Sequence, residues 1–218
     1  MHQLRFLRRA ALMFLATLVG CLIPLSAKTD ELPPLNDVPT AEHLVGKFIW
    51  ADLFTADPAV AGKFYCDLLG WTSVTFTRNG RTAYIVLSNL HGPVAGVLQR
   101  PPARPDGPAR WISYAAVDDV SRALAAVAAA GGQTLASPRN LPQRGTQALF
   151  ADKDGAVLGI LHSTSGDPGD YRPEPGDWIW TELFTSRPQD AGKFYRAVFN
   201  YAVDPDDRTM RKDLLLLS

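Results

Sequence analysis

The sequence predicts an α+β fold built from paired β-α-β-β-β units, followed by one incomplete third unit. The first observation is a duplication: residues 46–65 (GKFIWADLFTADPAVAGKFY) and 176–195 (GDWIWTELFTSRPQDAGKFY) are identical at twelve of twenty positions. The second is a weaker repeat within the first copy, where Asp57 and Gly70 are matched 62 residues later by Asp119 and Gly132. Similarity at a fixed offset indicates that one supersecondary unit recurs along the chain.

The first unit opens with a strand over residues 48–55. Its side chains alternate, so that Trp50, Asp52 and Phe54 share one face. A helix is expected next, because Asp57-Pro58 supplies an N-cap carboxylate and a proline at the first helical position.

The helix ends at Gly70, a residue suited to the left-handed C-terminal cap. Its apolar stripe comprises Ala61, Phe64, Tyr65, Leu68 and Leu69. Three short strands follow over 71–77, 82–88 and 94–99, and Asn79-Gly80 forms a hairpin turn between the first two.

A proline-rich connector over 100–110 precedes the second unit, in which the same order of elements returns. The expected elements are a strand over 111–117, a helix over 119–130, and strands over 133–136, 147–151 and 157–163. The third unit begins at Asp177 and has its helix from Pro188, with Asn200 as the cap. Its apolar helix face can dock on the first module, pair with another chain in a homodimer, or belong to an incomplete copy of a longer protein. We favour the third possibility, because the sequence ends within a predicted strand.

The composition is that of a globular protein with balanced charge. Twenty-two basic and 22 acidic side chains give a net charge of zero, and 46% of the residues are hydrophobic. The sequence has no basic stripe of the kind that would indicate a nucleic-acid partner. Two cysteines are too few for a disulfide framework.

Residues 1–27 have the organisation of an export signal. Three arginines precede an apolar run over 10–20, which is too short to span a bilayer as a mature helix. The run ends in Leu18-Val19-Gly20-Cys21, which resembles the bacterial lipoprotein box with Cys21 as the lipidated residue. Cleavage after Ala27 and a retained membrane anchor are the alternatives.

Residues 28–45 are expected to form a tether, because Pro33, Pro34 and Pro39 favour an extended chain. The expected location is the bacterial cell envelope, facing the periplasm and attached to the membrane through the lipid alone. Leu22 after the cysteine resembles the outer-membrane pattern. The predicted organisation is then a complete module over 46–163, a linker over 164–176 and an incomplete second module over 177–218.

The motifs of the first module are similar to those of the vicinal oxygen chelate superfamily, which includes glyoxalase I, extradiol dioxygenases and bleomycin-resistance proteins. The motifs are Trp50-Ala51-Asp52-Leu53, the run FYCDLLGW over 64–71, Val94-Ala95-Gly96 and the run DKDGA over 152–156. The resemblance covers residues 46–163 fully and 177–218 in part, and is closest to the subgroup with two modules per chain. It implies that the paired units form a cupped mixed sheet. It leaves the activity open, since one fold hosts many chemistries.

The superfamily's enzymes hold a divalent metal in this cup through His and Glu on the first and last strands of each unit. Aligned on the N-cap aspartates, those positions are Trp50, Ile112, Gly96 and Gly159, and none of them offers a ligating side chain. A slip of one residue offers Trp111 or Leu158, which ligate no better. His91 and His162 have no partner at ligand spacing, so we expect structural roles for both. The sequence therefore predicts neither a metal site nor a cofactor.

The cup is expected to be an apolar small-molecule site, with candidate ligand-binding residues Trp50, Phe54, Gly96, Tyr114 and Gly159. Asp52 is the candidate catalytic acid or base, although a carboxylate bonded to a neighbouring backbone or arginine is the more ordinary interpretation. The repeated Trp50 and Trp180 are interpreted as core or interface anchors, and Cys66 as a structural thiol.

The leading hypothesis is an envelope-anchored protein that binds a small apolar or aromatic molecule without a metal. The alternative is a lyase, isomerase or oxygenase that uses non-standard metal ligands or Asp52. A degenerate, non-functional copy is the third reading.

Overall fold

The structure is a computed structural model that describes residues 28–29, 32–100, 107–203 and 216–217. The predicted export signal and Cys21 lie outside the described residues. Within the described ranges, no helix has the length and apolar character needed to cross a membrane.

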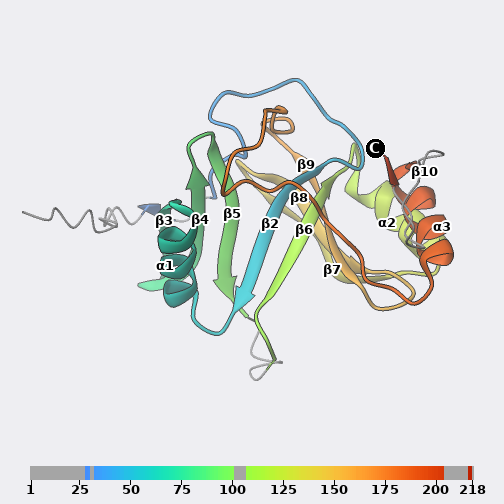
Figure 1. Ribbon diagram of the computed structural model, residues 1–218, viewed down its shortest axis with the longest axis horizontal. Coiled ribbons are helices and arrows are strands. Elements are labelled where there is room, and N and C mark those ends of the chain that lie inside the picture. The colour runs from blue at the N-terminus through green and yellow to red at the C-terminus, as the bar shows by residue number, and fades with distance from the viewer. Residues whose placement is uncertain (1–27, 30–31, 101–106, 204–215, 218) are drawn as a thin grey trace, which may run out of the picture.

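The first two units form one mixed sheet of nine strands in the order β1-β3-β4-β5-β2-β6-β9-β8-β7 (Figure 1). The first unit comprises β2 (Phe48–Thr55), α1 (Pro58–Leu69), β3 (Thr72–Arg78), β4 (Arg81–Asn89) and β5 (Gly92–Gln99). The second comprises β6 (Arg110–Ala116), α2 (Val120–Ala129), β7 (Gln133–Leu141), β8 (Gly145–Ala151) and β9 (Val157–Ser163). The third contributes α3 (Pro188–Phe199), β10 (Ala202–Val203) and β11 (Leu216–Leu217), and β1 (Lys28–Thr29) extends the edge of the large sheet.

The two units meet at their first strands, where β2 runs antiparallel to β6. Within each unit the first strand pairs in parallel with the last, β2 with β5 and β6 with β9. The predicted caps are present: the carboxylates of Asp57 and Asp119 accept hydrogen bonds from the backbone amides of Val60 and Arg122. Gly70 ends α1 in the left-handed conformation, with φ of 71°. The predicted fold class is confirmed.

Both helices of the complete module cover the outer face of the sheet, but α1 buries only part of the predicted stripe. Ala61, Tyr65 and Leu69 pack against the core, whereas Phe64 and Leu68 do not. The buried residues of α1 are Pro58, Gly62 and Cys66, while Phe64 and Leu68 are 55% and 61% exposed. The small side chains at these buried positions let the helix lie close to Ile85 and Leu87 of β4. Phe64 and Leu68 were therefore assigned to the wrong side of the helix.

The corresponding helix of the third unit does bury that stripe. Phe194 and Val198 of α3, which match Phe64 and Leu68 in the duplication, are 3% and 9% exposed and pack in the core around α2. Of the three possibilities considered for the apolar face of α3, the structure shows the first, docking on the complete module.

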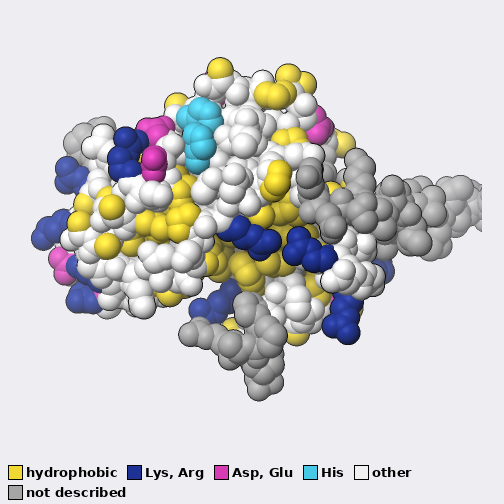
Figure 2. Space-filling model, turned by 180° about the vertical axis from the view of Figure 1, so that it is seen from behind, with side chains coloured by type: hydrophobic (Ala, Val, Ile, Leu, Met, Phe, Trp, Pro, Cys, Tyr) yellow, Lys and Arg dark blue, Asp and Glu magenta, His cyan; other side chains and the backbone are white. Residues whose placement is uncertain are grey.

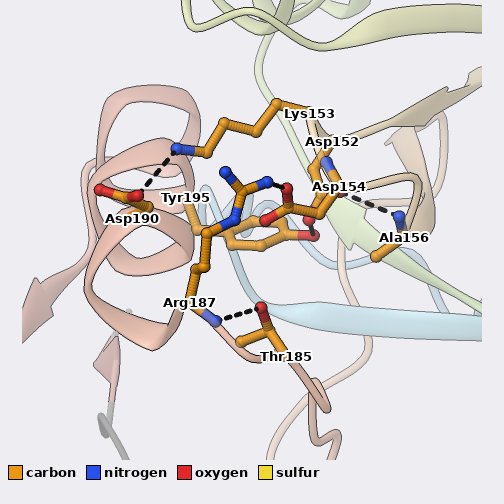
Figure 3. A network of polar contacts seen from close by, with 8 residues as sticks. All are labelled: Asp152, Lys153, Asp154, Ala156, Thr185, Arg187, Asp190 and Tyr195. Atoms are coloured by element: carbon orange, nitrogen blue, oxygen red, sulfur yellow. Dashed lines mark hydrogen bonds and ion pairs between the residues drawn. The ribbon is translucent and has the colours of Figure 1, made fainter.

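Polar contacts fix α3 against the turn between β8 and β9 (Figure 3). Arg187 forms an ion pair with Asp154, and Nζ of Lys153 lies 3.7 Å from Oδ2 of Asp190. The hydroxyl of Tyr195 donates to Oδ2 of Asp152 at 3.1 Å. The other oxygen of Asp152 accepts two backbone amides of its own turn, so one carboxylate links the turn to the helix.

The first strand of the repeated unit, β2 in the first copy, has no counterpart at the start of the third unit. A strand needs a neighbour to supply its ladder of hydrogen bonds, and no described strand pairs with residues 178–185. Trp178 packs against Trp71 and Trp111, whereas Trp180 and Phe184 are exposed. Trp180 is thus not a core anchor like its counterpart Trp50, which is 5% exposed.

Residues 32–44 lie against the sheet, although the sequence suggested that they extend away from it. We call this segment the strap. The side chain of Asn36 donates to the carbonyls of Ser165 and Gly166, and the amide of Leu44 donates to the Asp167 carboxylate at 2.6 Å. Leu35 is 2% exposed and belongs to the core on the inner face. The strap therefore forms part of one end of the cup.

Candidate functional site

Strand register brings the predicted residues of the cup together on the inner face of the sheet. Asp52 of β2 stands beside Gly96 of β5, Tyr114 of β6 stands beside Gly159 of β9, and Trp50 faces Tyr114 across the junction. Asp52 and Tyr114 are 62 residues apart, as are the N-cap aspartates, so they occupy equivalent positions in the two units. Phe54 lies one step further along β2 and is only partly buried.

Asp52 is the hydrogen-bond acceptor at the centre of this cluster and is 2% exposed. Its Oδ1 accepts a hydrogen bond from Nε1 of Trp50 at 2.8 Å and another from the hydroxyl of Tyr84. Nε1 of Trp50 also lies 3.0 Å from the Tyr84 oxygen, and Tyr114 hydrogen-bonds to the same carboxyl group. The carboxylate thus contacts side chains of β2, β4 and β6, and the charge of the nearby Arg144 also acts on it.

The two glycines do not leave empty space in the cup, because the side chains of Tyr84 and Tyr114 lie over them. A β-carbon on Gly96 would overlap the Tyr84 hydroxyl and Oδ1 of Asp52. A β-carbon on Gly159 would overlap the Tyr114 ring. Tyrosines therefore fill the centre of the cup at two of the four positions where the resemblance places metal ligands, Gly96 and Gly159.

Burial sets the protonation of the cluster. Desolvation raises the pKa of Asp52 above its ordinary value, and the hydrogen bonds from Tyr84 and Trp50 and the charge of Arg144 offset part of this rise. Desolvation also raises the pKa values of Tyr84 and Tyr114 well above 10, and the nearby Asp52 charge adds to the effect. Both phenols therefore stay protonated and act as donors.

Arg144 brings a buried cation to the same cluster and is 1% exposed. Its guanidinium carbon lies 4.1 Å from the centroid of the Trp50 ring, a cation–π contact. Its Nε donates to the carbonyl of Pro33 in the strap at 2.9 Å. Its Nη2 is buried and has no hydrogen-bond partner.

The residues of the cup do not fit a divalent metal. Such ions take several nitrogen or oxygen donors at once, and the described residues contain no group of three or more His, Cys, Asp or Glu side chains that could hold one. Asp52 is the only carboxylate of the cluster described above, and its Oδ1 already accepts from Trp50 and Tyr84. His162 lies outside this cluster, with Nδ1 3.0 Å from the carbonyl oxygen of Val117.

Sequence reasoning missed two members of the cluster, Tyr84 and Arg144. Tyr84 had a usable signal: it alternates with Val86, which pairs with Gly96, so it belongs to the inner face of β4. Arg144 precedes β8 in a turn, where no periodicity assigns a direction. Of the other candidates, Cys66 is buried in the helix–sheet core and the His91 ring lies 4.2 Å from that of Tyr171.

Beyond the central cluster, the inner face is apolar and hollowed. Figure 2 shows this face from behind, with a hydrophobic depression flanked by Lys and Arg side chains. Partly buried residues around the inner core are Leu32, Val74, Leu98, Ile112 and Leu149. Arg110 is exposed, pairs with Phe54 and by alternation shares the face of Ile112 and Tyr114. The site thus combines apolar walls, a buried polar centre and a basic rim.

Comparison with known proteins agrees with this architecture. A model of the Glyoxalase/Bleomycin resistance protein/Dioxygenase superfamily matches residues 43–160. The chain belongs to this superfamily.

Two named relatives show how far the similarity to the superfamily's members extends. "Putative glyoxylase CFP32" from Mycobacterium tuberculosis is 33% identical over 160 residues, which cover 72% of this chain and 61% of that protein. "Anthracycline biosynthesis protein DnrV" from Streptomyces peucetius is 31% identical over 165 residues, covering 70% and 60%. The chain therefore spans about three fifths of the length of the curated relatives that it matches.

Solved structures of the superfamily share the fold. The Mn(II)-bound glyoxalase from Novosphingobium aromaticivorans superposes with a TM-score of 0.53 at 20% identity, covering 74% of this chain and 55% of that one. A variant of homoprotocatechuate 2,3-dioxygenase from B. fuscum gives a TM-score of 0.52 at 17% identity, with coverages of 86% and 53%.

Proposed function

We propose that this superfamily member binds a small apolar or aromatic molecule in its cup without the superfamily's metal. The observation that carries the proposal is that aromatic side chains occupy the region where the superfamily's enzymes hold their metal. Tyrosine side chains lie over Gly96 and Gly159, and Trp50 donates a hydrogen bond to Asp52. Aromatic walls with a few placed polar groups are the usual composition of a small-molecule site. The name of the Streptomyces relative, an anthracycline biosynthesis protein, supports a planar aromatic ligand.

We further propose that the chain is anchored to the bacterial envelope through a lipid on Cys21. The support is the lipoprotein-type signal in the sequence. Metabolic labelling with a clickable palmitate analogue tests it: the wild type should incorporate label and the Cys21→Ser variant should not. Equal labelling of both proteins would overturn the anchor.

The binding proposal is tested by metal analysis and ligand titration on the same full-length preparation, purified in detergent. After exposure to Fe, Mn, Ni, Zn and Co in turn and desalting, we expect far less than one metal ion per folded chain. Calorimetric titration with planar aromatic probes should then show saturable binding in the desalted protein. Stoichiometric metal, or binding that occurs only after metal is added, would overturn the metal-free site.

The raised pKa of Asp52 favours one second candidate, an acid–base enzyme, because general acid–base groups act best with a pKa near the working pH. The Asp52→Asn variant separates the two functions. A binding protein should keep most of its ligand affinity, since an amide oxygen still accepts from Trp50 and Tyr84. An enzyme should bind its substrate but lose turnover by about 100-fold or more.

A further inference from the structure

The guanidinium of Arg144 is buried at the centre of the cup, and only one of the two donors on one of its edges has an acceptor. In an arginine side chain, Nε–H and one N–H of Nη2 point from the same edge of the planar group. At Arg144 the Nε position donates to the Pro33 carbonyl, while Nη2 is buried without a partner. A buried donor without an acceptor costs free energy, and the cost is larger when the donor carries charge. This edge is therefore a candidate binding site for a ligand with two acceptor atoms, of which the strap supplies only one.

A carboxylate is the group whose geometry matches the whole edge. Its two oxygens accept from Nε and Nη2 together, in the bidentate arrangement that arginine makes with carboxylates. The backbone carbonyl of Pro33 offers one oxygen and satisfies only half of this pattern.

The surroundings favour an anion attached to an apolar body. Leu35 of the strap occupies the inner core beside Trp50 and Tyr114, which shows that an apolar group fits there. The phenols of Tyr84 and Tyr114 are donors, and the exposed Arg110 adds positive charge on the same face of the sheet. Burial favours the neutral form of Asp52, which lessens its repulsion of a second carboxylate.

We propose that the cup binds an aromatic or apolar carboxylate whose two oxygens engage Nε and Nη2 of Arg144, displacing residues 32–35 of the strap. The strap thereby competes with the ligand for the same site. The Pro33 carbonyl occupies the position of the carboxylate, and Leu35 occupies the position of the apolar body. This inference rests on the proposed function, because it names the ligand class of the same site.

A matched pair of probes tests the inference: 2-naphthoic acid and its neutral amide, titrated calorimetrically into the full-length chain. We expect the acid to bind about ten-fold or more tightly than the amide, the effect of one charge-assisted hydrogen bond. Arg144→Gln should bring the ratio close to one, while the exposed Arg139→Gln should leave it unchanged.

A second variant leaves the buried arginine intact, so the inference can still be tested if Arg144→Gln fails to fold. Asn36→Ala removes two side-chain hydrogen bonds that hold the strap to residues 165–166. It should tighten binding of the acid by several-fold, because the competing segment is less firmly docked. An unchanged affinity in this variant would overturn the competition.

The remaining outcomes separate this inference from the proposed function. Equal binding of acid and amide would overturn the carboxylate while leaving an aromatic site. Binding of neither probe, in the wild type and in Asn36→Ala, would overturn both.

Discussion

The hydroxyl of Tyr84 donates to Oδ1 of Asp52 directly above Gly96, and the contact has room to form because this residue has no side chain. The pair joins β4 to β2 across β5, and Trp50 donates to the same oxygen. Both partners are buried, which makes the pair a structural element of the sheet as well as the polar centre of the site.

Gly96→Ala is expected to destabilise the protein, because the added methyl group must push Tyr84 or Asp52 aside. Overpacking of this kind typically costs about 1–3 kcal/mol of unfolding free energy. Urea denaturation measures it, with Gly169→Ala as the control, since nothing lies within 4 Å of a β-carbon there. Equal midpoints for the two variants would show that the cup accommodates a side chain at position 96.

The contact between Tyr84 and Asp52 should appear as coupling in a double-mutant cycle. At a pH above the raised pKa of Asp52, where this group is charged, Tyr84→Phe removes one hydrogen bond from a buried carboxylate, at a cost of about 1–3 kcal/mol. In the Asp52→Asn background the cost should be smaller, because the acceptor is no longer charged. The pair Asp52→Asn and Phe194→Ala, in separate cores, serves as the additive reference. Additivity of Tyr84→Phe with Asp52→Asn would contradict the coupling.

Stability should depend on pH through Asp52 with a defined sign. Because burial raises its pKa in the folded state, the contribution of Asp52 is fully present below about pH 4, the unfolded value, and is lost as the pH rises through the raised pKa. Asp52→Asn removes this titration, so the wild type should lose stability relative to the variant over that window. The Asp167 pKa is raised as well, but this group is present in both proteins and cancels in the difference. Parallel profiles from chemical denaturation at a series of pH values would refute the assignment.

The duplication supplies a matched test of how α3 docks. Phe194 is 3% exposed and packs near Phe150, with ring centroids 6.1 Å apart, so Phe194→Ala should cost about 3–5 kcal/mol if the docked helix unfolds with the core. Phe64 occupies the same place in the repeat but is 55% exposed, so Phe64→Ala should change stability by less than about 0.5 kcal/mol. Thermal denaturation of both variants measures the contrast. A small loss for Phe194→Ala would mean that α3 separates from the module before the core unfolds.

Local signals in the sequence were sufficient for most of the fold. The caps at Asp57 and Gly70 are set by hydrogen bonding and backbone conformation within a few residues, and both were predicted. The bounds of β2 and β9 matched as well, because each strand ends at a turn or a cap. The register that gathers Asp52, Gly96 and Tyr114 followed from equivalent positions in two repeated units.

The features that could not be predicted are the direction of Arg144, the position of the strap and the buried side of α1. Each depends on contacts with residues far away in the sequence. The direction of Arg144 is set by Pro33, 111 residues earlier. The strap has no apolar periodicity, since Leu35 is held as a single inserted side chain and not as part of a helix or strand. The buried side of α1 depends on which residues allow close approach to β4, which an apolar stripe alone does not reveal.

The glycines of the cup also limit how this sequence can change over evolutionary time. A histidine or glutamate introduced at position 96 would collide with Tyr84, and one at position 159 would collide with Tyr114. Each of these two replacements therefore requires a second, compensating replacement of a tyrosine, and each tyrosine alone would leave a void if it were lost first. The mutational path between this cup and a metal-holding one crosses variants that are less stable than either end, so selection for folding alone maintains the separation.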